Sequence, residues 1–118
     1  MPELAEDAEA DIRRHGTETY PNECCGALIA SGASIVEAFP LPNEHQGERR
    51  RRFLLGPNEY RMAEQRATDT KLELLGFYHS HPDHPAVPSQ FDLDHAWPNF
   101  AYVIVSRSEE HTSELQSL

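Results

Sequence analysis

Two histidines separated by one serine, His79 and His81, are the residues whose types and spacing best suggest metal chemistry. They end the apolar run LELLGFYHSH, which predicts a β-strand. Side chains two positions apart on a strand leave the same face, so both imidazoles are expected on the face of Leu75 and Phe77. Two imidazoles on one rigid face can share a zinc ion at Zn–N distances of about 2.0–2.1 Å. Because such a pair is more often a coincidence, it needs further ligands to count as a site.

A second polar group follows after a proline-rich stretch. In the segment SQFD, Ser89 is suited to cap a short helix predicted over residues 88–97, and Asp92 falls in its first turn. The two side chains share a helix face, so Asp92 can reach back to the histidines as a third ligand. Three protein ligands leave a fourth position open, as in catalytic zinc sites. Taken alone, however, this serine–aspartate spacing more often marks a helix cap.

A hydrolytic site of this kind has two further requirements. It needs a carboxylate that takes a proton from the attacking water without binding the metal. It also needs a hydrogen-bond donor for the oxyanion that develops during the reaction.

The elements that must position these residues alternate between strands and helices. The pattern predicts a weak amphipathic helix near residues 3–16 that ends near Gly16, and a helix over 58–71. Predicted strands cover 24–31, 34–43, 51–57, 72–81 and 100–106, the first two joined by a glycine-containing turn. The strand over 72–81 is largely apolar on both faces from Leu72 to Tyr78, which favours a central position in the sheet. The chain is therefore expected to be one mixed α/β (α+β) domain.

Composition limits the classes of function. The 118 residues suffice for one domain, and the 20 acidic against 10 basic residues give a net charge of −10. This charge argues against nucleic acid or an anionic membrane as a partner. The short basic run at residues 49–52 is expected to be a solvated strand edge, with a docking patch for an acidic partner as the alternative. The sequence shows no signal-peptide pattern and no disulfide framework, so a cytoplasmic protein is expected.

The last residues have an unusual sequence. Residues 107–117 read RSEEHTSELQS, which is the in-frame translation of a string that looks like a short-read sequencing adapter. We therefore expect the native domain to occupy residues 1–106 with its C-terminal part missing, and residues 107–118 to be a non-native tail. No residue of the tail is recruited into the site.

The histidine, serine and aspartate positions together resemble a known motif. They match the motif of the JAMM metallopeptidases, the catalytic branch of the MPN-domain family. That motif reads H-[S/T]-H, then seven residues, S, two residues and D. That motif also has an upstream glutamate, which YPNECCGAL supplies as Glu23. The resemblance covers residues 4–106 and implies a cytidine-deaminase-like domain with a mixed sheet flanked by helices. The short spacing is similar to stand-alone bacterial and archaeal members, including sulfur-carrier-conjugate peptidases and desampylases.

The resemblance implies a role for each motif residue. His79, His81 and Asp92 would hold one zinc ion per chain, Glu23 would be the general base, and Ser89 would donate to the oxyanion. Without the resemblance, Glu23 would be interpreted as an ordinary charge. The adjacent cysteines 24 and 25 are expected to be buried packing residues, with Cys25 on the face of Glu23 and Cys24 on the other.

The implied reaction is hydrolysis of a peptide or isopeptide bond after the C-terminal glycine of a ubiquitin-like or sulfur-carrier protein. Two alternatives stay open: a non-catalytic MPN-type scaffold, and a non-haem iron oxygenase with two histidines and one carboxylate. The complete motif argues against the first. The absence of an obvious task for Glu23 and Ser89 in oxygenase chemistry argues against the second. Zinc deaminases are discounted, because no Pro-Cys-x-x-Cys segment follows.

Overall fold

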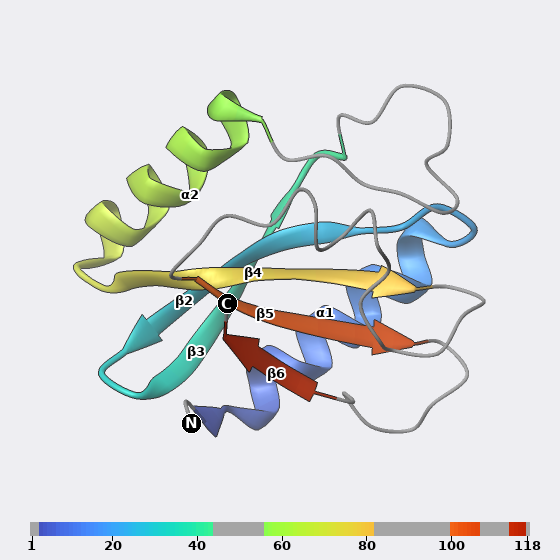
Figure 1. Ribbon diagram of the computed structural model, residues 1–118, viewed down its shortest axis with the longest axis horizontal. Helices are drawn as coiled ribbons and strands as arrows, with labels where there is room; N and C mark the ends of the chain where they lie inside the picture. The colour runs from blue at the N-terminus through green and yellow to red at the C-terminus, as the bar shows by residue number, and fades with distance from the viewer. Residues whose placement is uncertain (1–2, 44–55, 82–99, 107–113, 118) are drawn as a thin grey trace.

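The computed structural model describes residues 3–43, 56–81, 100–106 and 114–117 of the chain. Within these residues, one mixed sheet has the strand order β1-β3-β2-β4-β5-β6 and is accompanied by two helices (Figure 1). The elements are β1 (Glu3–Leu4), α1 (Glu6–Thr19), β2 (Cys25–Ser31), β3 (Ser34–Leu41), α2 (Pro57–Thr70), β4 (Glu73–His81), β5 (Ala101–Ser106) and β6 (Glu114–Ser117). This architecture confirms the mixed α/β fold predicted from the sequence.

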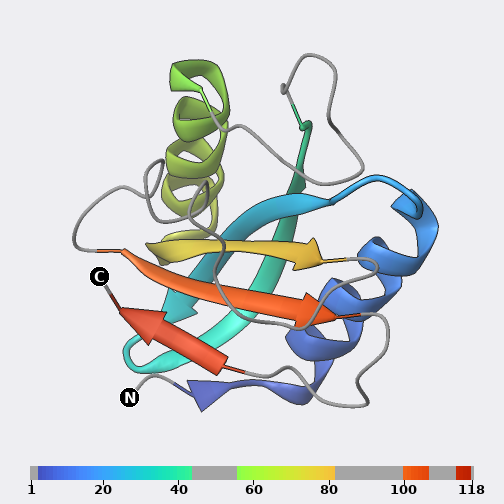
Figure 2. The ribbon, with the colours of Figure 1, turned by 45° about the vertical axis from the view of Figure 1, so that its right-hand side comes forward.

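The two helices cover opposite faces of the sheet, as the turned view shows (Figure 2). On one face, Ala8 and Ile12 of α1 pack against a cluster that includes Leu28 and Tyr78. On the other face, α2 packs against a cluster that includes Phe77. Neighbouring residues of one strand therefore enter different cores, as strand geometry requires.

Strand β4 lies in the middle of the sheet. It pairs antiparallel with β2 and parallel with β5, so its backbone is hydrogen-bonded on both sides. This confirms the central position predicted from its apolar sequence. Strands β2 and β3 form the expected hairpin, and Gly32 in its turn has a φ of +59°, which favours glycine.

One prediction about the faces of β4 is wrong. Leu75 packs against the core on the α1 face, whereas Phe77 belongs to the core on the α2 face. The cause is an irregularity in the pairing with β2, where Leu28 is opposite Gly76 but Ile29 is opposite Leu74. The extra residue on β4 inverts the alternation, as a β-bulge does. The inversion occurs before the histidines, so they keep the face of Phe77.

Helix α1 continues past Gly16 and ends at Thr19, so the predicted end near Gly16 is wrong. A Cβ atom at Gly16 would lie 3.5 Å from the Cβ atom of Ser80 and 4.0 Å from Cys24 Sγ. The glycine thus lies where the helix approaches the sheet closely. Packing at this point outweighs the helix-propensity penalty of glycine, which is about 1 kcal/mol.

Helix α2 begins and ends where the sequence indicates. Pro57 occupies the first turn, and the backbone N–H of Gly56 donates to Glu59 Oε1 at 2.7 Å. Lys71 ends the helix in the left-handed conformation with a φ of 60°. The helix is tied to β3 by a two-pronged ion pair between Arg66 and Glu37, in which Arg66 Nε lies 2.7 Å from Glu37 Oε1.

Two short strands were not predicted. Strand β1 pairs parallel with the start of β3, and β6, which lies within residues 107–118, pairs antiparallel with β5. The predicted strand at 51–57 lies outside the described residues up to residue 55, and its predicted end is wrong, because Pro57 begins helix α2. The basic run at 49–52 also lies outside the described residues. The predicted helix at 88–97 lies wholly outside them. Neither described helix has the length and hydropathy needed to cross a membrane.

Candidate metal centre

The end of strand β4 brings His79 and His81 together in the protein interior. Their exposed fractions are 2% and 4%, and their Nε2 atoms lie 3.1 Å apart. His79 pairs with Cys25 on one side and with Ile104 on the other, so neighbouring strands fix its backbone. The two rings thus converge on one point on the α2 face of a rigid strand.

Glu23 approaches this pair from the segment that leads into β2. Its side chain is 2% exposed, and its carboxylate lies in a group with the two imidazoles whose ligand atoms are all within 4.8 Å of one another. The Asn43 side-chain amide donates to the main-chain carbonyl of Glu23 at 3.2 Å, which fixes this segment against the end of β3. Residues 23, 79 and 81, which are far apart in sequence, therefore share one buried point.

The geometry of this cluster suits a small divalent cation. A tetrahedral ion held at about 2.0–2.1 Å by two nitrogens separates those nitrogens by roughly 3.3 Å. The measured 3.1 Å between the Nε2 atoms of His79 and His81 is close to that separation. Neutral imidazole and carboxylate are ligand types that zinc accepts, and Glu23 places a buried carboxyl group beside the imidazoles. In the part of the chain that the structure describes, this is the one group of histidine, cysteine and acidic side chains arranged for an ion.

The structure brings together three of the five predicted site residues. Ser89 and Asp92 lie outside the described residues, so their roles stay predictions. The two cysteines behave as expected. Cys24 belongs to the core on the α1 face, and its burial raises the pKa of its thiol. Cys25 Sγ faces the Leu41 carbonyl oxygen at 3.6 Å, close to residues of the other core.

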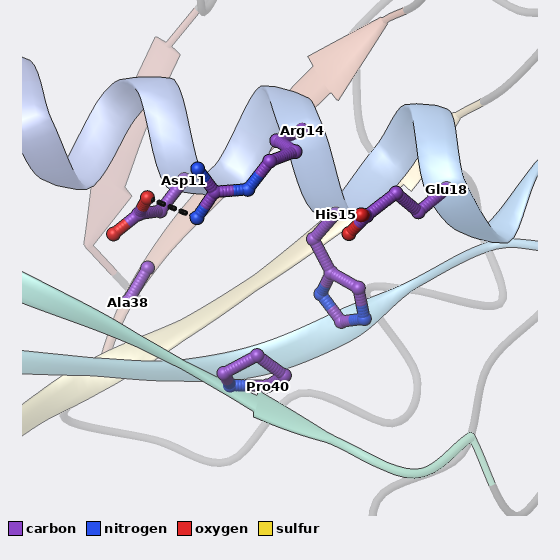
Figure 3. A pocket seen from close by; sticks show the side chains of 6 residues that line it. All are labelled: Asp11, Arg14, His15, Glu18, Ala38 and Pro40. Carbon is purple, nitrogen blue, oxygen red and sulfur yellow. Dashed lines mark hydrogen bonds and ion pairs between the residues drawn. The ribbon is translucent and has the colours of Figure 1, made fainter.

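A separate cavity of about 130 Å³ lies between α1 and β3 (Figure 3). Asp11, Arg14, His15 and Glu18 of the helix line one side, and Ala38 and Pro40 the other. It opens on the α1 side of the sheet, away from the histidine pair.

His15 beside this cavity connects α1 to the sheet. Its Nδ1 atom is hydrogen-bonded to the buried Tyr78 hydroxyl at 2.8 Å. Burial lowers the pKa of His15, and Glu18 partly opposes that shift. Burial raises the pKa of Tyr78, so this hydrogen bond joins a neutral phenol to helix α1. The hydrogen bond between His15 and Tyr78 joins helix α1 to the sheet, so we interpret His15 as a structural residue.

Comparison with known proteins now identifies the family. The model for prokaryotic homologs of the JAB domain matches residues 5–118, and the chain belongs to this family. It is 34% identical over 110 residues to the desampylase of Haloferax volcanii, covering 87% of this chain and 78% of that protein. It is also 34% identical over 94 residues to a probable TtuB-protein conjugate cleaving protease of Thermus thermophilus, covering 80% and 62% of the two chains.

Solved structures support the same fold. A protein of Desulfitobacterium hafniense, determined in solution, superposes with a TM-score of 0.82 at 29% identity over 98% of this chain and 81% of its own. A JAB1/MPN domain protein of Archaeoglobus fulgidus superposes with a TM-score of 0.65 at 19% identity, covering 98% of this chain and 88% of its own. The fold implied by the motif resemblance is thus confirmed.

Sequence reasoning missed two residues next to the site, Asn43 and Ser80. Asn43 holds the main chain of Glu23, and Ser80 lies between the two histidines on β4. Asn43 gave no pattern of its own. Ser80 did give a signal, because a hydroxyl residue at that place belongs to the motif, but no task was assigned to it.

Proposed function

We propose that this protein is a zinc-dependent hydrolase that cleaves a peptide or isopeptide bond after the C-terminal glycine of a ubiquitin-like or sulfur-carrier protein. The observation that carries the proposal is the buried convergence of Glu23, His79 and His81. The names of the two relatives supply the substrate class, since one is a desampylase and the other a conjugate cleaving protease. Family membership alone would fit a scaffold, but a scaffold has no need of this cluster.

His79, His81 and Asp92 would hold the zinc ion. Bound zinc supplies a Lewis acid that lowers the pKa of its water to about 7. Both histidines must offer a lone pair at Nε2 for this, so metal binding competes with protonation of the pair. Their fixed separation on β4 means that little rearrangement is needed to accept the ion.

Glu23 would move the protons. Its carboxylate takes a proton from the attacking water as the oxygen bonds to the substrate carbonyl carbon. It then delivers that proton to the amine nitrogen as the carbon–nitrogen bond breaks. Its burial supports this role, because a buried carboxylate exchanges its proton with substrate groups rather than with bulk water. Ser89 would donate a hydrogen bond to the oxyanion that forms between the two steps.

The test combines metal content with cleavage. The protein is purified without added chelator, its metals are quantified, and it is incubated with a panel of carrier proteins fused through their C-terminal glycine to a reporter. We expect one zinc per chain, release of the reporter, loss of cleavage on chelation and recovery with added zinc. Stoichiometric iron without zinc would favour the oxygenase alternative, and stoichiometric zinc without cleavage of any fusion would favour a scaffold.

A further inference from the structure

Ser80 makes an unusual contact where β2 leaves the sheet. In a regular antiparallel pair that is hydrogen-bonded, each residue donates its N–H to the carbonyl of the other. Here the Ser80 N–H donates to the Cys24 carbonyl at 3.1 Å, but the Cys24 N–H donates to the Ser80 side-chain Oγ at 2.9 Å. The serine side chain thus takes the place of a main-chain acceptor. We call this two-bond contact the Ser80 clamp.

The Ser80 clamp lies directly beside the metal centre. The ladder between β2 and β4 ends at the pair of Cys25 and His79, so Cys24 is held by the clamp rather than by regular pairing. Glu23 is the next residue along the chain. The clamp therefore fixes the approach of Glu23 to the strand on which the two histidines stand. Ser80 is 3% exposed, so water does not readily replace its hydroxyl.

The Ser80 side chain cannot take part in the chemistry directly. Successive side chains on a strand point to opposite faces, so Ser80 points away from the histidines on either side of it. This agrees with Gly16 of α1, where an added Cβ would lie 3.5 Å from the Ser80 Cβ. Any influence of Ser80 on the reaction must pass through the main chain of Cys24 to Glu23.

We propose that Ser80 is a positioning residue that holds Glu23 at the distance from His79 and His81 that proton transfer needs. The inference rests on the proposed function and adds to it a residue that acts from the opposite face of the sheet. Its effect should be large, since a misplacement of about 1 Å in a catalytic group can lower the rate about 100-fold.

The main test compares Ser80→Ala with Ser80→Thr and Ile12→Val. Ser80→Ala removes the acceptor and should lower kcat about 10- to 100-fold, with KM and the zinc Kd each changing less than about threefold. Ser80→Thr keeps the hydroxyl and should restore most of kcat. Ile12→Val is the matched control, because it alters a buried side chain in the same core but leaves both residues of the clamp intact. It should stay within about threefold of the original kcat.

Two further variants separate positioning from general damage. In a Glu23→Gln background, adding Ser80→Ala should change the residual rate less than about twofold, because the effect passes through Glu23. An equal fold-loss in both backgrounds would overturn the proposal. Ser80→Cys retains the side-chain size with a weaker acceptor. This variant replaces Ser80→Ala in the test if the alanine variant folds poorly. It should lower kcat below that of the unmodified protein, and an unchanged kcat would contradict the clamp.

A measurement that does not depend on activity distinguishes a failure of this proposal from a failure of the proposed function. If the zinc-loaded protein cleaves no fusion, the proposed function fails, and amide hydrogen exchange still tests the clamp. Ser80→Ala should speed exchange at the Cys24 N–H by about tenfold or more and leave Leu28 in β2 unchanged. Unchanged exchange at Cys24 would show that the clamp does not hold this segment and would overturn the proposal.

Discussion

The Nε2 atoms of His79 and His81 lie 3.1 Å apart on one face of β4, where each side chain is at most 4% exposed. Two imidazoles at this distance on one strand present their ring nitrogens to one point, which is the arrangement that the proposed zinc site requires.

Removing either ring should abolish metal binding. We expect His79→Ala and His81→Ala each to weaken zinc binding by more than about 100-fold, since even outer-shell changes weaken metal sites 10- to 100-fold. Hydrolysis should be lost with the metal. His15→Ala is the matched control, because His15 is bonded to Tyr78 on the other face of the sheet. Competition with a chromogenic chelator measures the Kd, and zinc binding retained by both site variants would contradict the assignment.

Glu23 should be needed for turnover but not for zinc. Glu23→Gln keeps the side-chain shape and removes the base, so kcat should fall about 10²- to 10⁴-fold. The zinc content should stay at the level of the unmodified protein. Glu59→Gln provides the comparison, because Glu59 is also buried but accepts a hydrogen bond at the start of α2. That change should lower stability by about 0.5–2 kcal/mol while kcat is retained. Near-normal turnover of Glu23→Gln would disprove the general-base role.

The ion pair between Glu37 and Arg66 should make stability depend on pH. The hydrogen bond from Arg66 lowers the pKa of the Glu37 carboxyl from its ordinary value of 4.5. A carboxyl whose pKa is depressed in the folded state stabilises that state above its unfolded pKa, and this contribution is lost as the pH falls through the folded value.

Glu37→Gln should therefore lower the melting temperature at pH 7 by roughly 1–4 °C. The difference from the unmodified protein should disappear as the pH falls well below 4.5. Thermal unfolding across this range gives the result, and a Glu37→Gln difference that persists at acid pH would argue against the pair.

Gly76 should be the least replaceable glycine of the sheet. A Cβ atom at this position would overlap the main-chain carbonyl of Ala101 in β5, which cannot move without breaking the pairing that holds β4. Gly76→Ala should cost about 3 kcal/mol or more. At Gly32, nothing lies within 4 Å of an added Cβ, and only the φ of +59° opposes it. Gly32→Ala should therefore cost about 1 kcal/mol. Denaturant unfolding ranks the two, and the reverse order would contradict this view of the sheet.

Much of the fold and part of the site could be predicted from local patterns. The strand carrying His79 and His81 is strongly apolar before the histidines, and α2 has clear signals at its start, so both were placed correctly. The same-face argument succeeded for the histidines because they follow the irregularity in β4. It failed for Leu75, because a bulge depends on how two strands pair and leaves no periodic signal.

Other features depend on contacts between distant parts of the chain. Helix α1 continues past Gly16, where the packing of the glycine near Ser80 outweighs the local propensity. Glu23 has no pattern that marks it as functional, and only the family motif indicated it. Its place beside the histidines results from the pairing of β2 with β4, which brings Cys25 opposite His79, 54 positions further along the chain. The Ser80 clamp likewise exists only once that pairing has formed.

The central position of β4 also bears on how the protein would lose a bound ion. The two histidines cannot separate unless β4 parts from β2 on one side and from β5 on the other. Local unfolding of the outer strands β1 and β6 leaves the pairing around the two histidines intact. Heat should therefore release the ion and melt the domain in a single cooperative transition.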